Sequence, residues 1–468
     1  MDKFFKITEH GSTVKTEIIA GFTTFFAMAY IIFVNPNQVT GFTEGLSNIW
    51  NAVYVASILA ATIGTLLMAL YAKMPFAQAC GMGLNSFFFV SFILPQVIAG
   101  GDCVQGYQAG LVIVLISGII FMILSLTGAR QYIAKAMPEC LKKAIPAGIG
   151  LFITYIGFQN VGIIQANQYT LTQFVDIHGA INGEGGIMTV LPALLALLGF
   201  LIIVILGKRN VKGNVLLGIV ITAVLYYVFS GTVPSFDITQ IGQSFKDFAD
   251  IGVTGVFQSA SWKHAFSPEF VGGVFSAILY IITFCLIDMF DTIGTLYGTA
   301  AQADLLDENG DPQNLDKCMA CDSIATVSGA VLGTSTCTTF VESASGVAAG
   351  GRTGLTSLVV SICFFVCLFL TPLASIVPAC ATAPALIYVG VLMLGNFKNV
   401  DMSDLSSAAP AFLTLIAMPL TYSIANGIGI GSIAYTIIAI CTGKFQKKDI
   451  MVAIIGLLFC LKFIFITM

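Results

Sequence analysis

The sequence predicts an all-α integral membrane protein whose chain crosses the bilayer many times. Of its 468 residues, 57% are hydrophobic and only 9% are charged, whereas about 25% of the residues of a soluble domain are charged. Because ionisable side chains are so few, they cannot cover a water-facing surface of this size. Lipid must therefore cover much of the surface. Apolar runs long enough to cross a hydrocarbon layer of ~30 Å recur along the whole chain.

Fourteen candidate spans follow one another. Three are short or interrupted by glycine and hydroxyl residues, at 78–97, 317–333 and 338–350. The others are continuous apolar runs at 17–36, 50–72, 106–128, 143–163, 187–207, 213–230, 270–298, 352–372, 384–397, 407–425 and 429–443. A further apolar run at 449–467 contains Lys462 and fits either a spanning helix or a surface helix.

The basic residues predict how the chain is oriented, because lysine and arginine favour the cytoplasmic side of a membrane. When the spans alternate from a cytoplasmic N-terminus, all lysines and arginines fall on that side except Lys246, Lys263 and the unassigned Lys462. If one span were missed, the basic residues of every later connection would fall on the opposite side of the membrane. The distribution therefore supports both the span count and a cytoplasmic N-terminus in the cell (plasma or inner) membrane.

A faint internal repeat relates the two halves of the chain. Met137-Pro-Glu-Cys140, followed by Pro146-Ala147, returns as Val377-Pro-Ala-Cys380, followed by Pro384-Ala385. These segments open the fifth and the twelfth spans, which are seven spans apart. Because an odd number of spans reverses direction, the halves are predicted to form an inverted repeat of two seven-helix units, as in many secondary transporters.

The third and tenth spans, which correspond under this symmetry, are the least regular. Residues 75–89 and 333–346 each contain an extended-looking stretch followed by a short helix rich in small residues. Such a break is tolerated in lipid only where it faces protein or a watery cavity, and the helix N-termini would offer free N–H groups near the midplane. The alternative is a pair of tightly packed helices with small residues at their contact.

Carboxylates lie within these apolar or small-residue spans. Asp288, Asp291 and Glu342 would each cost at least ~2.5–3.5 kcal/mol at the bilayer centre, so a functional role is the default expectation. Asp288 and Asp291 share one helical face, and Glu342 opens the short helix of the tenth span. A structural role in capping or pairing is the alternative, above all for Asp291. Asp322, near the start of its span, is predicted to be a capping or interfacial residue.

The chemistry of these side chains predicts the ligand. No lysine or arginine is placed deep enough to neutralise the acids, so they are expected to be protonated, hydrogen-bonded to a ligand, or both. A ligand rich in N–H donors fits, because an ionised carboxylate only accepts. Asn85 offers a donor and an acceptor suited to an amide-like ring edge. Phe87, Phe88, Phe89 and Phe340 are placed to stack on a planar base, although packing is the better interpretation for at least two of them.

The cysteines do not indicate a metal or redox site. Most of the twelve lie in apolar runs, where a thiol behaves as a small hydrophobe. Cys318 and Cys321 form a C-x-x-C, but no second pair or nearby histidine completes a zinc-binding set. We therefore expect no metal and no cofactor.

Several motifs together resemble one family. The segments 16–24 (TEIIAGFTT), 30–36 (YIIFVNP), 83–88 (GLNSFF), 288–295 (DMFDTIGT) and 342–356 (ESASGVAAGGRTGLT) are similar to those of AzgA-like hypoxanthine–adenine–guanine permeases. These are relatives of the uracil permeases and the nucleobase–ascorbate transporters. The resemblance runs nearly from end to end, and the motifs are specific in combination.

The resemblance implies fourteen helices in two inverted repeats, divided between a core domain and a gate domain. The core would comprise 1–130 (spans 1–4) and 266–375 (spans 8–11). The gate would comprise 131–265 (spans 5–7) and 376–468 (spans 12–14 and the C-terminal segment). In the family the gate often mediates dimerisation, so a homodimer is implied.

The resemblance also implies roles for particular residues. Asn85, Asp288 and Glu342 match the positions that contact the base in family members, and Asp291 matches a residue linked to proton coupling or conformational change. Uracil permeases have a glutamate in the eighth span, so Asp288 indicates the purine branch. Phe87, Phe340 and Ser343 complete the predicted substrate contacts, and Asp288 and Glu342 are also candidates for carrying the proton.

The predicted function is proton-coupled symport of purine nucleobases into the cell, with the core moving as a rigid body against the gate in an elevator mechanism. A neutral base needs a coupled ion, and one proton crossing 100 mV supplies ~2.3 kcal/mol, enough for roughly fifty-fold accumulation. The predicted partners are the base, protons and the lipid bilayer, with no nucleic acid. The chain is not predicted to be an enzyme.

Two other functions fit part of this pattern. An anion transporter or channel of the same architecture is one, because fold does not determine function, but its site is expected to lack acidic residues. An intramembrane prenyltransferase-type enzyme is the other, since Asp288-x-x-Asp291 resembles an aspartate-rich diphosphate motif, but the further carboxylates and basic residues are missing. The sequence favours none of adenine, guanine and hypoxanthine over the others, and sodium is the alternative to the proton as the coupling ion.

Overall fold

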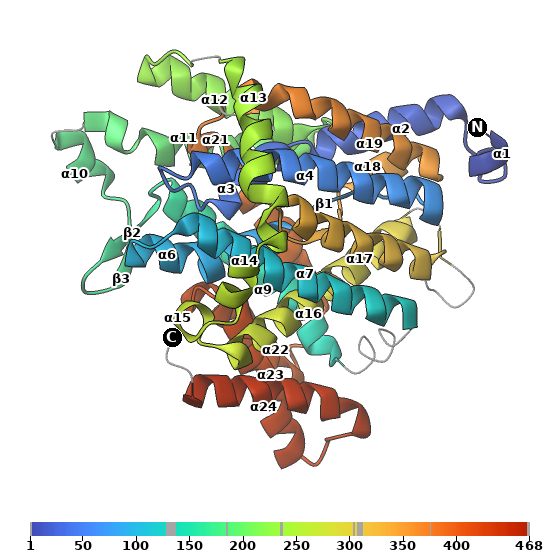
Figure 1. Ribbon diagram of the computed structural model, residues 1–468, viewed down its shortest axis with the longest axis vertical. Coiled ribbons are helices and arrows are strands. Elements are labelled where there is room, and N and C mark those ends of the chain that lie inside the picture. The colour runs from blue at the N-terminus through green and yellow to red at the C-terminus, as the bar shows by residue number, and fades with distance from the viewer. Residues whose placement is uncertain are drawn as a thin grey trace.

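The computed structural model describes residues 2–127, 137–183, 186–234, 237–302, 305–306, 312–374 and 376–465. The predicted domain boundaries at 130/131 and 375/376 touch residues outside these ranges. Helices dominate the described chain (Figure 1). The helices of the first half are α1 (Asp2–Phe5), α2 (Val14–Met28), α3 (Ile31–Val39), α4 (Ser47–Leu67), α5 (Met82–Phe88), α6 (Leu94–Ala99), α7 (Cys103–Thr127), α9 (Glu139–Asn160), α10 (Ile177–Asn182), α11 (Leu191–Lys208), α12 (Asn214–Ser230), α13 (Thr239–Asp247), α14 (Ser259–Ala265) and α15 (Pro268–Val271).

The second half is built in the same way. Its helices are α16 (Val274–Gln302), α17 (Leu315–Leu332), α18 (Ser343–Ala348), α19 (Gly354–Val366), α20 (Thr371–Ala374), α21 (Ala379–Leu394), α22 (Leu405–Leu420), α23 (Ile424–Cys441) and α24 (Ile450–Phe465). The strands are β1 (Gln78–Cys80) and β4 (Cys337–Thr339), which pair with each other, and β2 (Ile164–Asn167) and β3 (Leu171–Phe174), which form an exposed hairpin.

Ten helical segments within the described ranges are long and apolar enough to cross a membrane, and α12 and α22 are shorter apolar helices. This confirms the prediction of a multi-pass, all-α membrane protein. The first predicted span, 17–36, is two helices, because α2 ends at Met28 and α3 begins at Ile31. The turn between them contains Tyr30, which is fully buried.

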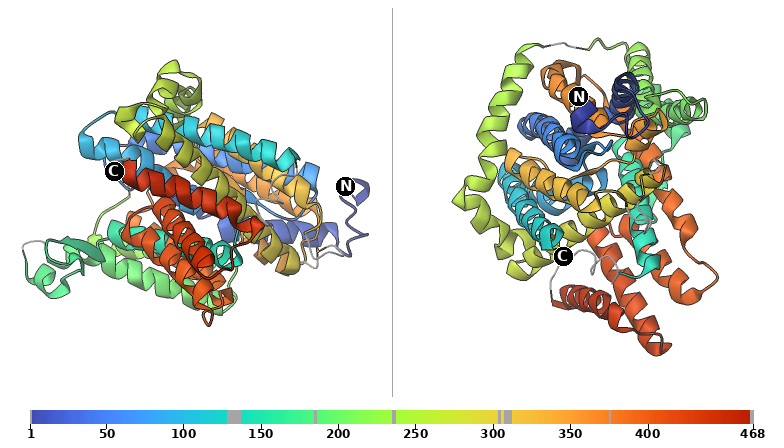
Figure 2. Two further views of the ribbon diagram at one scale, coloured as in Figure 1. Left: turned by 90° about the horizontal axis from the view of Figure 1, so that it is seen from below. Right: turned by 90° about the vertical axis from the view of Figure 1, so that its right-hand side faces the viewer.

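The helices pack in two sets (Figure 2). In one set α4 packs on α3, α17 and α19, α7 packs on α16 and α17, and α2 packs on α18 and α19. In the other set α9 packs on α21 and α22, α11 packs on α12 and α21, and α22 packs on α23. The segment 239–265 belongs with the first set, because α13 crosses α4 and α14 packs on α7. The sequence predicts instead that residues 131–265, which include this segment, belong to the gate.

The two repeat segments found in the sequence start equivalent helices that pack on each other. Pro138 is the residue before α9 and Pro378 is the residue before α21, where the missing N–H costs no helical hydrogen bond. Glycines let the two helices approach closely: a Cβ on Gly150 would lie 2.8 Å from the carbonyl oxygen of Gly390. The repeat therefore marks matching elements in space.

Candidate functional site

The centre of the first helical set is a two-stranded antiparallel ribbon formed by the two irregular spans. β1 pairs with β4 in the register Gln78↔Thr339, Ala79↔Thr338 and Cys80↔Cys337, and all six residues are buried. In a membrane interior an unpaired strand would leave its backbone polar groups unsatisfied. Each broken span therefore supplies the hydrogen-bonding partner of the other. The prediction of short extended segments in both spans is confirmed.

A short helix follows each strand. α5 continues from β1 through Gly81, and α18 continues from β4 with Glu342 at its N-cap position. No side chain caps the N-terminus of either helix. Both pack against α16, which also contacts β4. The predicted site residues on α5, α16 and α18 are thus gathered around one ribbon.

Asn85 lies in α5 and is fully buried. Its Oδ1 atom accepts a hydrogen bond from the hydroxyl of Ser335, which precedes β4. Its Nδ2 group has no hydrogen-bond partner within the described chain. A buried amide that lacks a partner costs ~1–3 kcal/mol, so this donor is available for a ligand.

Asp288 lies in α16 and is 1% exposed. Its Oδ2 atom accepts a hydrogen bond of 2.7 Å from the hydroxyl of Thr326 in α17. The same hydroxyl lies 2.9 Å from the backbone oxygen of Cys337, which ties the carboxylate to β4. The Oδ1 atom is buried with no partner among the described residues. One oxygen of Asp288 is therefore held by protein, and the other is an unused acceptor.

Glu342 is half-buried, and its Oε1 atom accepts a hydrogen bond of 2.5 Å from the hydroxyl of Tyr30. Asp291 is also half-buried and lies close enough to Glu342 for the two charges to repel when both are ionised. The two acids that the sequence placed on different spans thus form one electrostatic group. Tyr30 was not predicted as a site residue, because nothing in a buried tyrosine of an apolar run distinguishes it from a packing residue.

Asp322 contradicts its prediction as a capping or interfacial residue. It is fully buried in α17 and accepts hydrogen bonds from Thr292 (2.5 Å), from the Nε2 group of Gln78 (3.1 Å) and from Thr339 (3.3 Å). These donors come from α16, β1 and β4, so Asp322 joins both strands of the ribbon to the helix that carries Asp288. The prediction was wrong because α17 begins outside the packed core and Asp322 lies two turns inside it.

The four phenylalanines are all buried. The ring of Phe87 lies 5.0 Å from that of Phe284, and Phe88 meets Phe92 at 5.3 Å. Phe89 lies against Gly41, at a point where a Cβ would collide with its ring. The side chains of Phe87 to Phe89 thus pack within the protein in this conformation. Phe340 directly follows β4, and its N–H donates to the backbone oxygen of Ala77.

The side chain of Ser343, a predicted substrate contact, has a defined structural partner. Its hydroxyl oxygen accepts a hydrogen bond of 3.0 Å from the backbone N–H of Ala77, just before β1. The residue is fully buried. The hydroxyl hydrogen is still available as a donor, so this contact fixes where Ser343 lies without using its full hydrogen-bonding capacity.

Glu17 is a fifth acid within the predicted spans, and its hydrogen bonds join two of the sequence motifs. Its carboxylate, fully buried in α2, accepts from the backbone N–H groups of Arg352 (3.0 Å) and Thr353 (3.3 Å) and from the hydroxyl of Thr356 (2.6 Å). These groups lie at the start of α19, where free N–H groups favour negative charge. The motifs at 16–24 and 342–356 therefore meet in space for a structural reason.

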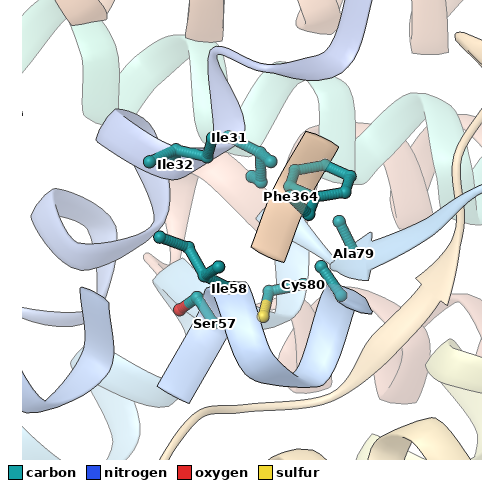
Figure 3. A pocket seen from close by; sticks show the side chains of 8 residues that line it. Ile31, Ile32, Ser57, Ile58, Ala79, Cys80 and Phe364 are labelled. Atoms are coloured by element: carbon teal, nitrogen blue, oxygen red, sulfur yellow. The ribbon is translucent and has the colours of Figure 1, made fainter. Parts of the chain in front are cut away.

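A small pocket, with room for about one water molecule, lies beside the ribbon (Figure 3). It is bounded by α3, α4, β1 and α19, and mostly apolar side chains face it. Its lining is Ile31, Ile32, Ser57, Ile58, Ala61, Ala79, Cys80 and Phe364. None of the predicted site residues lines it. The pocket is linked to Glu342 along the chain, because Ile31 directly follows Tyr30, whose hydroxyl donates to Glu342.

Metal ligands are not gathered anywhere in the described ranges, where no group of three or more histidine, cysteine, aspartate or glutamate side chains is placed to hold an ion. Cys318 and Cys321 are both buried in α17. The chemistry that the site offers is hydrogen bonding by Asn85, Asp288 and Glu342 inside an apolar shell.

Comparison with known proteins gives full-length relatives. A guanine/hypoxanthine permease of Bacillus subtilis, PbuG, is 43% identical over 473 aligned residues, which cover 100% of this chain and 100% of the relative. An adenine permease of Escherichia coli, AdeQ, is 37% identical over 468 residues, covering 100% of this chain and 96% of the relative. These relatives confirm the resemblance drawn from the motifs.

Solved structures share the fold at low sequence identity. The transmembrane domain of the cyanobacterial bicarbonate transporter BicA superposes with a TM-score of 0.60 at 16% identity, covering 88% of this chain and 96% of that domain. The murine anion transporter Slc26a9 superposes with a TM-score of 0.59 at 11% identity, covering 92% and 69% of the two chains. At this identity the likeness concerns the fold alone.

The profile of one family, described as "Permease family", matches residues 15–430. This match takes in the ribbon, both short helices and all of the predicted site residues. Its members and the relatives above are transporters and not enzymes. By its family profile and its full-length relatives, the chain belongs to the Permease family of membrane transporters.

Proposed function

We propose that this protein is a secondary active transporter that carries purine nucleobases into the cell together with protons. The observation that carries the proposal is a pair of buried atoms that have no hydrogen-bond partner among the described residues, the Nδ2 donor of Asn85 and the Oδ1 acceptor of Asp288. Both residues are linked to the chain that leads into β4. Asn85 accepts from Ser335, just before the strand, and Asp288 is linked through Thr326 to Cys337 in the strand. A purine presents ring nitrogens or a carbonyl as acceptors and ring N–H groups as donors, which is the complementary set. Relatives of this chain are named as guanine/hypoxanthine and adenine permeases.

Each side chain has a distinct role in this proposal. Asn85 donates to an acceptor on the ring, and Asp288 accepts a ring N–H group. Glu342 accepts a second N–H group through Oε2, because Tyr30 occupies Oε1. Phe87 and Phe340 flank the ring. Ser343 remains a substrate contact through its unused hydroxyl hydrogen.

The proton would be carried by the acids around the ribbon. A neutral base brings no charge across the membrane, so its accumulation requires a coupled ion. Asp288, Asp291 and Glu342 lie where a carboxyl group is poorly hydrated and has no lysine or arginine within ion-pair distance, among the described residues. A proton on Asp291 would relieve its repulsion with Glu342 and leave the Glu342 carboxylate free to accept a ring N–H group. Binding of the proton at Asp291 and of the base would therefore favour each other.

Alternating access would use the two packed sets of helices. We assign α2 to α7 and α16 to α20 to a core that carries the base, and α9, α11, α12 and α21 to α23 to a gate. The antiparallel pairing of β1 with β4 and the matching positions of α9 and α21 support fourteen spans in two inverted repeats. The N-terminus would be cytoplasmic in the plasma membrane, and the gate would form the contact in a homodimer.

Uptake of radiolabelled hypoxanthine by cells and by proteoliposomes tests the proposal. We expect saturable uptake that a protonophore abolishes and that unlabelled adenine, guanine or hypoxanthine inhibits, whereas uracil does not. Replacing sodium with potassium should leave the rate unchanged. Uptake that survives the protonophore and requires sodium would overturn proton coupling. Absence of any purine-dependent uptake or binding by the purified protein would overturn the substrate assignment.

Variants of the two unpartnered residues test the site. Asn85→Ala and Asp288→Asn should each weaken hypoxanthine binding by about 5- to 150-fold, the equivalent of ~1–3 kcal/mol for one lost buried hydrogen bond. Asp250→Asn is the matched control, because Asp250 is an exposed carboxylate in the π-helical turn that follows α13. Unchanged binding in Asn85→Ala and Asp288→Asn would remove both residues from the site.

An anion transporter is the second candidate, and the fold shared with BicA and Slc26a9 is what favours it. Buried acids that lack a basic partner argue against an anion in the same place, because like charges repel. Bicarbonate, chloride and sulfate uptake into proteoliposomes distinguishes the two. We expect uptake of these anions no greater than in protein-free vesicles.

A further inference from the structure

The C-terminal helix α24 is fastened to α23. Asp449, which directly precedes α24, is buried and accepts a hydrogen bond of 3.1 Å from the hydroxyl of Tyr435 on α23. Its other oxygen accepts from the backbone N–H of Gln446 at 2.8 Å, which closes a capping box. A buried carboxylate with partners on both sides holds the start of α24 in one place.

Close packing continues the attachment further along α24. A Cβ on Gly456 would lie 3.3 Å from the backbone oxygen of Ser432, so the two helices meet almost backbone to backbone. Phe459 lies over Gly429, where a Cβ would come within 2.6 Å of its ring. Small residues at such a contact are typical of tight helix pairs in membranes. α24 therefore belongs structurally to α23, next to which Figure 1 shows it.

One residue of α24 reaches across to α16. Lys462 is 7% exposed and is the one buried lysine or arginine among the described residues. Its Nζ atom lies 5.3 Å from the centre of the Tyr280 ring on α16, within the ~6 Å of a cation–π contact. The three ion pairs formed within the described chain lie elsewhere. By sequence alone, the run at 449–467 that contains Lys462 fits either a spanning or a surface helix.

Tyr280 belongs to an aromatic cluster that leads to the candidate site. Its ring lies 5.4 Å from that of Phe92 and 6.0 Å from that of Phe87, and both of these rings also pack on Phe284. Phe87 is two residues from Asn85 on α5. Lys462 thus touches the part of α16 that packs directly against the broken third span.

We propose that α24 is a clasp between the gate and the core, fixed to α23 and closed on α16 by the contact of Lys462 with Tyr280. A charged side chain in a membrane helix is costly to keep without a role, and the Tyr280 ring is the partner that Lys462 has within the described part of the chain. The contact joins the two sets of helices that move against each other in the proposed transport cycle, on which this inference rests. The contact between Lys462 and Tyr280 stabilises the conformation described here, and it must break before the core can move against the gate.

The clasp makes a quantitative prediction for transport by proteoliposomes. Lys462→Met and Tyr280→Leu each remove the contact, so each should raise the maximal rate of hypoxanthine exchange about 3- to 10-fold, because release of the core no longer breaks it. The dissociation constant for hypoxanthine, measured on the same purified proteins, should stay within about two-fold of the wild type. The double variant should be no faster than either single variant, since both changes remove one interaction.

Conservative variants separate the clasp from a general loss of packing. Lys462→Arg and Tyr280→Phe keep a cation and a ring, so both should exchange at the wild-type rate. Lys448→Met, an exposed lysine before α24, is the control for loss of charge. Wild-type rates in Lys462→Met, or rate effects that multiply in the double variant, would overturn the clasp. If the wild-type protein neither binds nor exchanges hypoxanthine, it is the proposed function that fails.

Discussion

Tyr30 donates its phenolic hydrogen to Glu342 across 2.5 Å, although 312 residues separate them along the chain. The tyrosine lies in the turn between α2 and α3, and the glutamate lies at the start of α18. This contact joins the predicted first span to the predicted tenth span. It also holds one oxygen of Glu342 and leaves the other available.

Removing the Tyr30 hydroxyl should affect transport more than folding. Hydrogen bonds to charged groups contribute ~1.5–3 kcal/mol, so Tyr30→Phe frees Glu342 to turn away from its present position. We expect the KM for hypoxanthine uptake to rise about 3- to 30-fold. Tyr169→Phe, which changes a tyrosine that is 90% exposed, is the control. Superimposable uptake curves for Tyr30→Phe and the wild type would exclude a role for this bond in positioning Glu342.

Asp322 should be essential for the ribbon. Asp322→Ala removes the acceptor of three buried donors, on Thr292, Gln78 and Thr339. Thr292 retains the Thr338 hydroxyl at 2.8 Å and Gln78 retains a longer contact with Thr339 at 3.5 Å, so the cost is about that of one unsatisfied buried group, ~1–3 kcal/mol. We expect a lower melting temperature in detergent and loss of hypoxanthine binding. Asp322→Asn keeps one acceptor oxygen and should lose less of both. Equal melting temperatures for Asp322→Ala and the exposed-site control Asp250→Ala would contradict this role.

Glu17 should act on stability through the start of α19. Glu17→Ala removes the acceptor of two backbone N–H groups and one hydroxyl, and replacement of a helix cap alone costs ~0.5–2 kcal/mol. We expect a clear fall in the melting temperature, followed by the intrinsic fluorescence of the purified protein, and a smaller fall for Glu17→Gln. Glu9→Ala changes an exposed glutamate in a surface ion pair, which contributes little, and should melt like the wild type.

The contact between α9 and α21 should tolerate no added side chain. A Cβ on Gly150 would lie 2.8 Å from both the Gly390 oxygen and the Met393 Cβ, so Gly150→Val forces the helices apart. Overpacking of this kind costs ~1–3 kcal/mol, and we expect reduced folded yield on size-exclusion chromatography. Gly242→Val is the control, because a Cβ there meets no atom within 4 Å. Normal yield and melting of Gly150→Val would show that the helix pair is loosely packed.

Much of the candidate site was predicted from the sequence because ionisable and amide side chains are conspicuous in apolar spans. Asp288, Asp291, Glu342 and Asn85 were predicted in this way, and in the structure they lie on α16, at the start of α18 and on α5, the helices that adjoin the β1–β4 ribbon. The partners Tyr30, Thr326 and Ser335 were not found. Hydroxyl residues occur in membrane helices for many reasons, and which acid each one meets depends on contacts between segments far apart in the chain.

The sequence alone determined that this chain lies in a membrane and crosses it many times, because solvation in lipid depends on composition and run length. It also located the two broken spans and the repeated helix starts, since glycine, proline and hydroxyl residues leave a local signature. Only the tertiary structure decided that the broken spans pair with each other, that Asp322 holds the ribbon and that Lys462 of α24 meets Tyr280. Each of these contacts depends on how helices far apart in the sequence pack together, and no local sequence pattern determines which of them meet.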